Sequence, residues 1–251
     1  MSHRFEGKVA LITGSSQRIG AALARALASR GMTVAIHYRR SKGPAEELAA
    51  ELETLGGRGV TFAADLEDPS AAERLYTAVV ERLGAPRVLV HNASRYEPLR
   101  LADTDPAALR RELAVHLESP LALSRAFAAA LPAGAEGRIV CMLDWRATLP
   151  DPLVFPYTLS KGGLWSLMRN LAVELGPHVT VNGIAPGAIL PASSKTVPAE
   201  TEADLDKRAL GLPIDRAGRV EDVIEACCFF IDGAPYTTGA VLPVDGGRHL
   251  L

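Results

Sequence analysis

Cysteine is scarce in this chain, with three residues in 251. Cys141, Cys227 and Cys228 are odd in number, lie in apolar surroundings and include an adjacent pair. A small disulfide-stapled scaffold would carry an even and denser set of cysteines. The sequence therefore excludes that class and predicts buried, reduced thiols in a reducing compartment.

An excess of one charge is also missing. The 27 Lys and Arg residues nearly balance the 29 Asp and Glu residues. Nucleic-acid-binding and membrane-surface proteins usually carry a strong basic surplus, so the sequence favours a small-molecule partner over nucleic acid or membrane. No uncharged apolar run reaches the ~18 residues of a spanning helix, and the N-terminal residues lack the apolar run of a signal peptide. We expect a cytoplasmic protein.

Metal and serine-nucleophile signatures are absent from the sequence as well: no His or Cys pair has metal-ligand spacing, and no nucleophile elbow occurs. What the chain does contain is apolar material, 48% of its residues, in short β-branched runs that alternate with longer Ala/Leu/Glu/Arg runs of helical period. This alternation is typical of an α/β fold with a parallel sheet covered by helices. We expect one domain over residues 1–251.

The expected strands are apolar without clean alternation, as strands buried on both faces should be. They cover 9–13, 33–37, 59–63, 88–91, 137–143, 179–184 and 240–244. The expected helices cover 18–30, 44–55, 70–83, 106–130, 156–175 and 220–231. The long irregular stretch 186–219, with a short helical possibility at 202–209, is expected to be a functional loop.

A glycine turn follows the first expected strand. Gly14 and Gly20 flank this turn, and an Ala/Leu/Arg helix starts directly after it. A helix N-terminus offers free backbone N–H groups and a positive dipole end to a phosphate. An ordinary βα turn would also explain two glycines, but the position after the first strand favours nucleotide binding.

The end of the second strand indicates which nucleotide is bound. An Asp or Glu there would hold the ribose 2′-hydroxyl of NAD, whereas this chain has His37-Tyr38-Arg39-Arg40-Ser41. Arg40, with Ser41, His37 and Arg18, could form a pocket for the 2′-phosphate of NADP, because guanidinium groups bind phosphate in bidentate fashion. A solvated cationic turn is the alternative interpretation.

Tyr157 and Lys161 lie four residues apart at the start of an expected helix, which places phenol and ammonium on one face. A nearby ammonium would stabilise the phenolate, lower the pKa of Tyr157 and make proton transfer feasible. The pair therefore predicts a proton-transfer site.

Together these motifs resemble the short-chain dehydrogenase/reductase family over almost the whole chain. The resemblance rests on Thr13-Gly14…Gly20, Asp65-Leu66, Asn92-Ala93-Ser94, Tyr157…Lys161, Asn182-Gly-Ile-Ala-Pro186-Gly187 and Val244-Asp245-Gly246-Gly247. It implies a Rossmann-type, doubly wound sheet of seven parallel strands with helices on both faces, and a homo-oligomer, either tetramer or dimer.

The resemblance also implies roles for individual residues. Lys161 would hold the nicotinamide ribose, Asn92 and Ala93 would line the cofactor, Asp65 and Leu66 would flank the adenine, and 186–219 would be the substrate loop. The expected NADPH/NADP-binding set is Gly14, Arg18, Ile19, Gly20, His37, Tyr38, Arg39, Arg40, Ser41, Asp65, Leu66, Asn92, Ala93, Ser94, Tyr157, Lys161, Pro186 and Gly187.

Three departures from the common family pattern narrow the substrate. Arg18 replaces the middle glycine of the turn, Asp144 replaces the Ser about a dozen residues before the tyrosine, and His116 replaces the Asn of the proton-relay helix. An ionised carboxylate repels a carbonyl oxygen but suits a protonated or N–H-bearing ring. These departures, with His37 to Ser41, resemble the pteridine reductases and dihydromonapterin reductases.

In that branch Ser94 and the aromatic two residues later, here Tyr96, hold the pterin by contact and stacking. The expected catalytic residues are Asp144, Tyr157 and Lys161, and the expected substrate-binding residues are Ser94, Tyr96, Asp144 and Tyr157. Asp144 could instead cap a loop, Tyr96 could be a packing residue, and His116 is better interpreted as a hydrogen-bonded helix histidine than as a proton donor.

The sequence thus predicts an NADPH-dependent reductase of a dihydropterin, of dihydromonapterin or dihydrofolate type. The alternatives are an NADPH-dependent carbonyl reductase of a small ketone, sugar or oxoacyl substrate, and a non-catalytic NADP-responsive binding protein. The intact Tyr157/Lys161 pair argues against the last.

Overall fold

The computed structural model describes residues 3–191 and 201–251. Its centre is one sheet of seven parallel strands in the order β3-β2-β1-β4-β5-β6-β7. The order reverses between β1 and β4, as in a doubly wound sheet, so the expected fold class is confirmed. The strands are β1 Val9–Ile12, β2 Thr33–Tyr38, β3 Arg58–Ala63, β4 Val88–His91, β5 Gly137–Met142, β6 Val179–Pro186 and β7 Val241–Val244.

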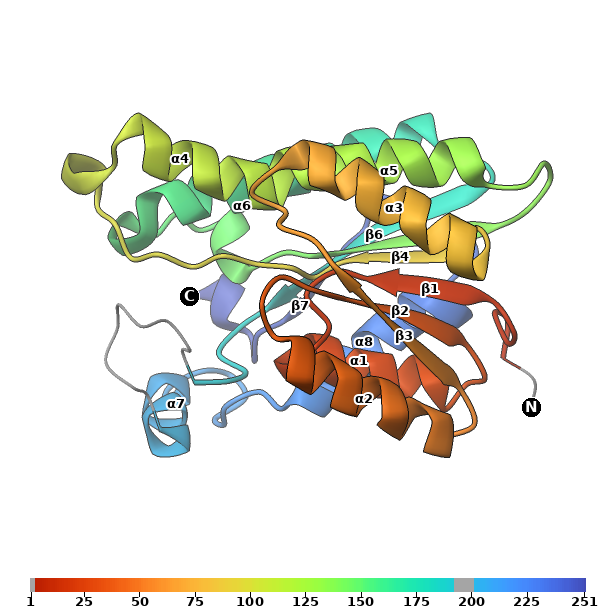
Figure 1. Cartoon of the computed structure of the whole chain (residues 1–251). Helices are drawn as coiled ribbons and strands as arrows, with labels where there is room; N and C mark the ends of the chain where they lie inside the picture. Colours follow the sequence, from red (N-terminus) through yellow and green to blue (C-terminus); the bar gives the residue numbers. More distant parts are fainter. Residues whose placement is uncertain (1–2, 192–200) are drawn as a thin grey trace.

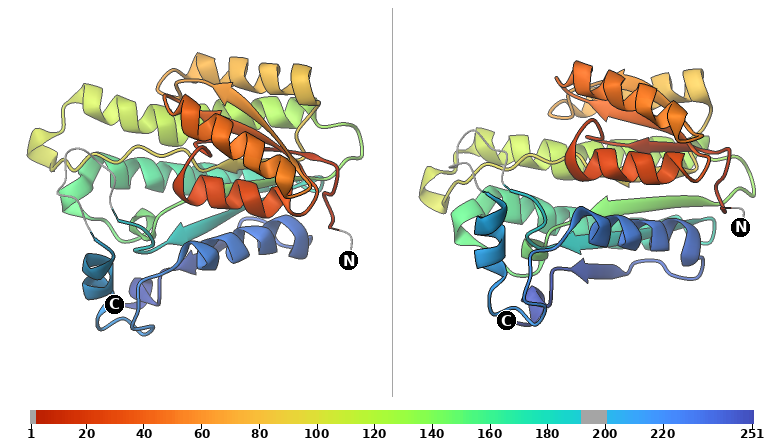
Figure 2. Two further views of the ribbon diagram at one scale, coloured as in Figure 1. Left: turned by 60° about the horizontal axis from the view of Figure 1, so that its bottom comes forward. Right: turned by 90° about the horizontal axis from the view of Figure 1, so that it is seen from below.

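Helices cover both faces of the sheet (Figures 1 and 2). One layer holds α1, α2 and α8, and the other holds α3, α4, α5 and α6. Their bounds are α1 Arg18–Ala28, α2 Lys42–Thr54, α3 Pro69–Leu83, α4 Pro106–Leu113, α5 Ser119–Ala130, α6 Phe155–Glu174 and α8 Val220–Cys228. Every strand expected from the sequence is therefore present in the structure, with shifted ends, and so is each expected helix except 106–130.

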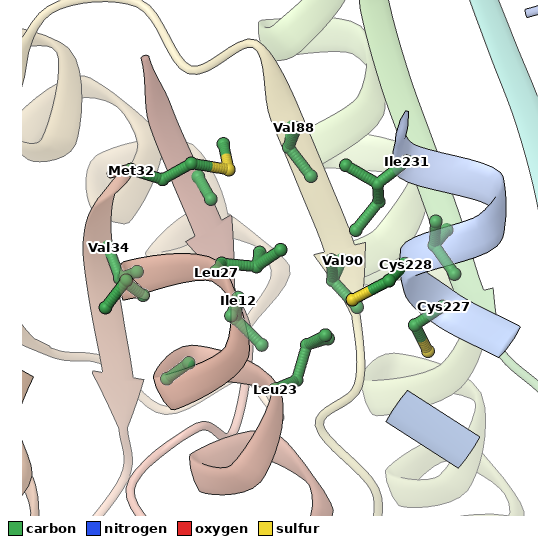
Figure 3. Close-up of a cluster of buried hydrophobic side chains, with 14 of the residues drawn as sticks. Ile12, Leu23, Leu27, Met32, Val34, Val88, Val90, Cys227, Cys228 and Ile231 are labelled. Atoms are coloured by element: carbon green, nitrogen blue, oxygen red, sulfur yellow. The ribbon is translucent and has the colours of Figure 1, made fainter. Parts of the chain in front are cut away.

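Two apolar clusters hold these layers on the sheet. On one face Leu23 and Leu27 of α1 pack on Ile12 and Val34, with Cys227 at the α8 side (Figure 3). All five side chains are buried. Val9 pairs with Thr33 and Ala10 with Val88, so β1 lies between β2 and β4. The three cysteines are free and buried, as the sequence predicted.

The expected helix 106–130 is not continuous, which corrects the sequence prediction. Residues Ala114–Glu118 form a wider π turn between α4 and α5. Pro120 has no N–H to donate to the carbonyl of His116, four residues earlier, so a regular α-helix loses a bond there. The wider turn lies beside the site described below and contains His116.

The expected loop 186–219 lies partly outside the described residues, because 192–200 are not among them. Its second half contains α7, Glu202–Ala209, which matches the short helix expected at 202–209. None of the described helices is long and apolar enough to cross a membrane.

Candidate active site

A cavity of about 650 Å³ opens at the C-terminal ends of the strands, where the strand order reverses. Open α/β sheets bind ligands at this position, because neighbouring loops diverge there. The lining brings together most of the residues expected from the sequence: Gly14, Arg18, Ile19, Gly20, His37, Arg39, Asp65, Leu66, Asn92, Ala93, Ser94, Tyr96, Asp144, Tyr157, Lys161, Pro186 and Gly187.

The glycine turn leaves no room for a side chain at Gly14 or at Gly20. A Cβ on Gly14 would meet the Cα of Ala93 at 2.9 Å, and one on Gly20 would meet the Asn92 amide nitrogen at 2.6 Å. Arg18, in place of the family glycine, has a φ of 57°, which costs a non-glycine residue on the order of 1 kcal/mol. Its guanidinium donates to the carbonyl of Pro191 at 2.7 Å, which links the turn to the segment after β6.

His37 has a different role from the one expected. Its Nδ1 accepts from the N–H of Gly14 at 2.9 Å, so Nε2 carries the proton and donates to the carbonyl of Ala64 at 3.1 Å. Burial lowers the pKa of His37 to about 4, which keeps the ring neutral. Both ring nitrogens are occupied by backbone groups, so His37 holds the glycine turn and is not available to bind a phosphate.

The two arginines after β2 differ in their surroundings. Arg39 lines the cavity and donates to Glu67 Oε1 at 2.6 Å, with Asp65 at 3.7 Å. Arg40, Tyr38 and Ser41 do not line the cavity. Arg40 is exposed and pairs with none of the described residues, so its charge is uncommitted. The prediction that Arg40 and Ser41 take the 2′-phosphate stays a prediction.

Asn92 supports the turn from the neighbouring strand. Its side-chain amide donates to the carbonyls of Thr13 and Gly14 at 2.8 and 3.0 Å. Asp65 and Leu66 line the same cavity, in the segment between β3 and α3.

Asp144 and Tyr157 meet inside the cavity. The phenol donates to Asp144 Oδ2 at 2.9 Å, and Asp144 Oδ1 accepts the N–H of Arg146 at 2.8 Å. The second bond caps the short 3-10 helix Trp145–Ala147. The carboxylate therefore caps the short helix, one of the two roles weighed from the sequence, and it also contacts the Tyr157 phenol; its catalytic role stays a prediction.

The expected effect of Lys161 on Tyr157 is wrong for this structure. Its ammonium donates to the carbonyl of Met142 at 2.8 Å and lies 5.7 Å from the centroid of the phenol ring. Burial, and then the Asp144 carboxylate, raise the pKa of Tyr157 well above its usual value. Burial lowers the pKa of Lys161 to about 8. Tyr157 is thus held as a protonated phenol that points at a carboxylate.

Tyr96 lies against Tyr157. The two ring centroids are 5.0 Å apart in an edge-to-face arrangement, and Tyr96 is partly exposed to the cavity. Ser94 lies two residues earlier on the same loop, with its hydroxyl 3.0 Å from His116 Nε2.

His116 organises this side of the cavity. Its Nε2 accepts the N–H of Arg95 at 3.2 Å, so Nδ1 carries the proton and contacts Ser160 Oγ at 2.8 Å. Burial lowers the pKa of His116 well below its usual value. The interpretation as a neutral, hydrogen-bonded helix histidine is confirmed.

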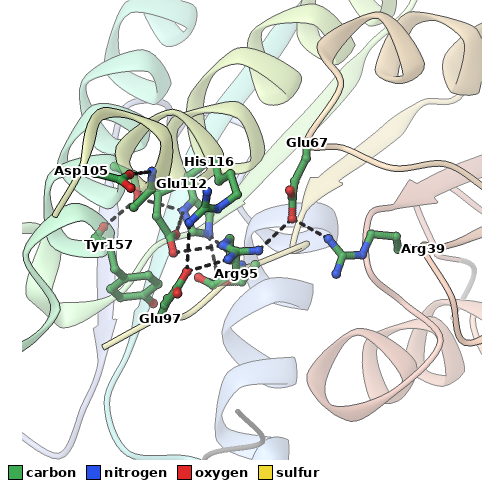
Figure 4. Close-up of polar contacts among 12 residues, drawn as sticks. Arg39, Glu67, Arg95, Glu97, Asp105, Glu112, His116 and Tyr157 are labelled. Atoms are coloured by element: carbon green, nitrogen blue, oxygen red, sulfur yellow. Dashed lines mark hydrogen bonds and ion pairs between the residues drawn. The ribbon is translucent and has the colours of Figure 1, made fainter. Parts of the chain in front are cut away.

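Several charged residues of the site could not be found from the sequence. Glu112 is 1% exposed, lies 3.4 Å from His116 Nδ1 and 3.6 Å from Arg95 Nε, and its pKa is raised by burial to about 8. Arg95 also pairs with Glu67 and Glu97 (Figure 4). Arg146 and Arg208 also line the cavity. No motif marks these residues, because their partners come from distant loops.

The fold and site define the class of a dinucleotide-dependent oxidoreductase. Residues 14–249 match the family model described as enoyl-(acyl carrier protein) reductase. The chain is 35% identical over 251 residues, 98% of this chain and 97% of the relative, to the L-rhamnose 1-dehydrogenase (NAD(P)(+)) of Sphingomonas sp. (strain SKA58).

Solved structures of similar proteins include the alternative dihydrofolate reductase 1 (FolM) of Brucella canis complexed with NADP, with a TM-score of 0.88, 35% identity and coverage of 97% of this chain and 95% of that one. The corresponding protein of Brucella suis, in complex with NADP, has a TM-score of 0.87, 34% identity and coverage of 97% and 96%. The chain belongs to the short-chain dehydrogenase/reductase family. It is an NAD(P)-dependent oxidoreductase, and its cofactor is NADP(H).

The residues of the cavity fit this cofactor. The side-chain-free turn at Gly14 and Gly20 leaves backbone at the N-terminus of α1 open to a pyrophosphate, and the cationic end of β2 suits a 2′-phosphate. When bound, NADPH supplies a hydride.

Proposed function

We propose that this protein reduces a dihydropterin, of dihydromonapterin or dihydrofolate type, at the expense of NADPH. The observation that carries the proposal is the hydrogen bond between Tyr157 and Asp144 in the cavity. The likeness of the chain to two NADP-bound FolM proteins, both alternative dihydrofolate reductases, supports it.

The proposed reduction of a C=N bond follows from the carboxylate at Asp144. Reduction of a C=N bond needs a hydride on carbon and a proton on nitrogen. The Asp144 carboxylate can accept from a ring N–H and hold the ring in place, and the Tyr157 phenol, which donates to the same carboxylate, can supply the proton to the nitrogen. A carbonyl oxygen at the same place would face the carboxylate and be repelled.

The substrate would lie beside Tyr96. This ring stands edge-on to Tyr157 and offers a face to a flat bicycle, with Ser94 nearby as a hydroxyl partner. In this proposal the site consists of Asp144, Tyr157 and Lys161 as catalytic residues, and Ser94 and Tyr96 as substrate contacts. The 2′-phosphate would lie at Arg39, Arg40 and Ser41, and the segment 186–219 would form the substrate loop.

A second candidate is reduction of a carbonyl compound, favoured by the 35% identity to a sugar dehydrogenase over 98% of the chain. NADPH oxidation measured against dihydropterins, folates and simple ketones or sugars separates the two. We expect turnover of the dihydropterins and negligible turnover of ketones. Brisk reduction of a ketone or sugar, with no dihydropterin turnover, would replace the pterin proposal by this candidate.

We further propose a homo-oligomer in a reducing compartment such as the cytoplasm. Leu153, Leu159 and Leu210 are large apolar side chains with half or more of their surface exposed in the single chain. Contact with a second copy would bury such surface, and the buried free thiols suit a reducing compartment. Light scattering of the purified protein tests the oligomer.

A further inference from the structure

One carboxylate oxygen joins the two ends of the cavity. Arg39 Nη1 and Arg95 Nη1 both donate to Oε1 of Glu67, at 2.6 and 2.8 Å (Figure 4). Arg39 follows β2, Glu67 lies between β3 and α3, and Arg95 follows β4. Three loops at the same edge of the sheet therefore meet at one atom.

The two arginines face different parts of the ligand site. Both line the cavity, whereas Glu67 does not. Arg39 lies at the end of β2, beside the position proposed for the 2′-phosphate. Arg95 directly precedes Tyr96, which packs against Tyr157. Glu67 thus lies outside the cavity lining, and it contacts one end of the cavity through Arg39 and the other end through Arg95.

We propose that Glu67 competes with the 2′-phosphate of NADPH for Arg39, and thereby couples the phosphate site to the segment 94–97 after β4, which carries Ser94 and Tyr96. Glu67 would be a specificity-determining and positioning residue and would not contact the substrate. The inference rests on the proposed phosphate position at the end of β2 and is independent of the identity of the substrate.

The competition follows from the charges. A guanidinium makes its strongest hydrogen bonds with a phosphate, in bidentate geometry, so a bound 2′-phosphate draws Arg39 away from the shared oxygen. The carboxylate of Glu67 is then left with Arg95 as its close cationic partner. NADH lacks this phosphate and leaves Arg39 on Glu67.

The change at Arg95 reaches the substrate side through several bonds. Besides Glu67, Arg95 pairs with Glu97 at 2.6 Å, and its backbone N–H donates to His116 Nε2. A stronger hold of Glu67 on Arg95 therefore restrains the loop that carries Ser94 and Tyr96. Coupling of this kind is reciprocal, so substrate binding should also favour NADPH over NADH.

The size of the effect is limited by solvent. The side chains of Arg39, Arg95 and Glu67 are 40%, 26% and 25% exposed, and partly exposed ion pairs contribute modestly. We therefore expect a several-fold change in affinity.

The first experiment measures the Kd of NADP+ and of NAD+ by fluorescence or calorimetry for the wild type and Glu67→Gln. Removing the competing charge should tighten NADP+ about three- to tenfold and change NAD+ less than about twofold. An unchanged ratio of the two Kd values, or weaker NADP+ binding, would overturn the inference.

Arg39→Ala separates this inference from the proposed phosphate position. If Arg39→Ala weakens NADP+ selectively while Glu67→Gln has no effect, the phosphate position stands and the competition by Glu67 is refuted. If Arg39→Ala leaves the ratio of NADP+ to NAD+ affinity unchanged, the phosphate does not contact Arg39, and both are refuted.

The second experiment follows the loop itself by hydrogen exchange of a peptide covering 94–97, at saturating NADP+ or NAD+. NADP+ should protect this peptide more than NAD+ in the wild type, and equally in Glu67→Gln. Glu97→Gln is the matched control, because Glu97 pairs with Arg95 but has no contact with Arg39. It should loosen the loop and leave the ratio of NADP+ to NAD+ affinity unchanged. Equal protection by both cofactors in the wild type would contradict the coupling.

Discussion

The phenol of Tyr157 donates a hydrogen bond to Asp144 across 2.9 Å, from the first turn of α6 to the loop after β5. The hydroxyl proton of Tyr157 lies between the two groups, inside the cavity. At these two positions the family pattern has a tyrosine and a serine. A pair of this kind acts as one unit, so losing either member should disable the same step.

For this pair, Asp144→Ala should lower kcat with a dihydropterin by about two to four decades, the range for a positioned acid–base group. NADPH affinity should change little. Tyr157→Phe should cause a similar loss, and the double variant should be little worse than either one. Steady-state kinetics and cofactor titration check these outcomes.

Asp144 also caps the short helix after it, so a structural loss must be separated from a chemical one. Asp144→Asn is the control. Its amide oxygen can still accept the hydrogen bond from the N–H of Arg146, but the amide cannot take up a proton as the carboxylate can. A folded Asp144→Ala protein with full pterin turnover would refute the catalytic role.

Tyr96 is expected to provide a stacking surface for the substrate. Tyr96→Ala should raise KM about three- to tenfold, because an aromatic contact contributes about 0.5–1.5 kcal/mol beyond its buried area. Tyr96→Phe should keep KM near the wild-type value. Diaminopteridine antifolates should inhibit competitively against the substrate. An unchanged KM in Tyr96→Ala would identify Tyr96 as a packing residue.

Arg40 should select NADPH. Its exposed guanidinium pairs with none of the described residues, which leaves it available to a 2′-phosphate. Arg40→Ala should weaken NADPH about tenfold, since a charge-assisted bidentate contact is worth more than ~1.4 kcal/mol, and leave NADH within about twofold. Equal affinity of the wild type for the two cofactors would contradict this role.

His37 is the contrast to Arg40, since its ring supports the glycine turn by way of Gly14. His37→Ala should therefore weaken NADPH and NADH by similar factors, as both share the pyrophosphate. A selective loss of NADPH would show that His37 recognises the phosphate after all.

Glu112 should make stability depend on pH. Burial raises its pKa from 4.5 to about 8, so the folded state binds more protons than the unfolded state between these values. The contribution of Glu112 to stability is therefore present below pH 4.5 and is lost as pH rises to 8.

Glu112→Gln removes this titration. The variant should gain stability relative to the wild type as pH rises from 5 to 9, by on the order of 3 kcal/mol, and match it near pH 5. Urea unfolding at pH 5, 7 and 9 measures the difference. Glu81→Gln, on the exposed face of α3, should show no such trend. A constant difference across the pH range would contradict the assignment.

Much of the site was determined by the sequence alone, because its residues have fixed local positions. A glycine turn between a buried strand and a helix must lie at the C-terminal edge of a parallel sheet, which places Gly14 and Gly20 at the cavity. Residues four apart on a helix share a face, which places Tyr157 beside Lys161. The same reasoning gave the order of strands and helices.

The tertiary structure decided which polar groups meet. His116 contacts Ser160, 44 positions away, and Glu67 contacts Arg39 and Arg95, each 28 positions away, because three crossover loops converge at one edge. It also decided how those groups are charged. The pKa of Tyr157 is raised, against the sequence expectation, because burial and the Asp144 carboxylate act on the phenol while the Lys161 ammonium is held at a backbone carbonyl. Spacing along a helix fixes a shared face, but only the packed fold fixes where each hydrogen bond goes.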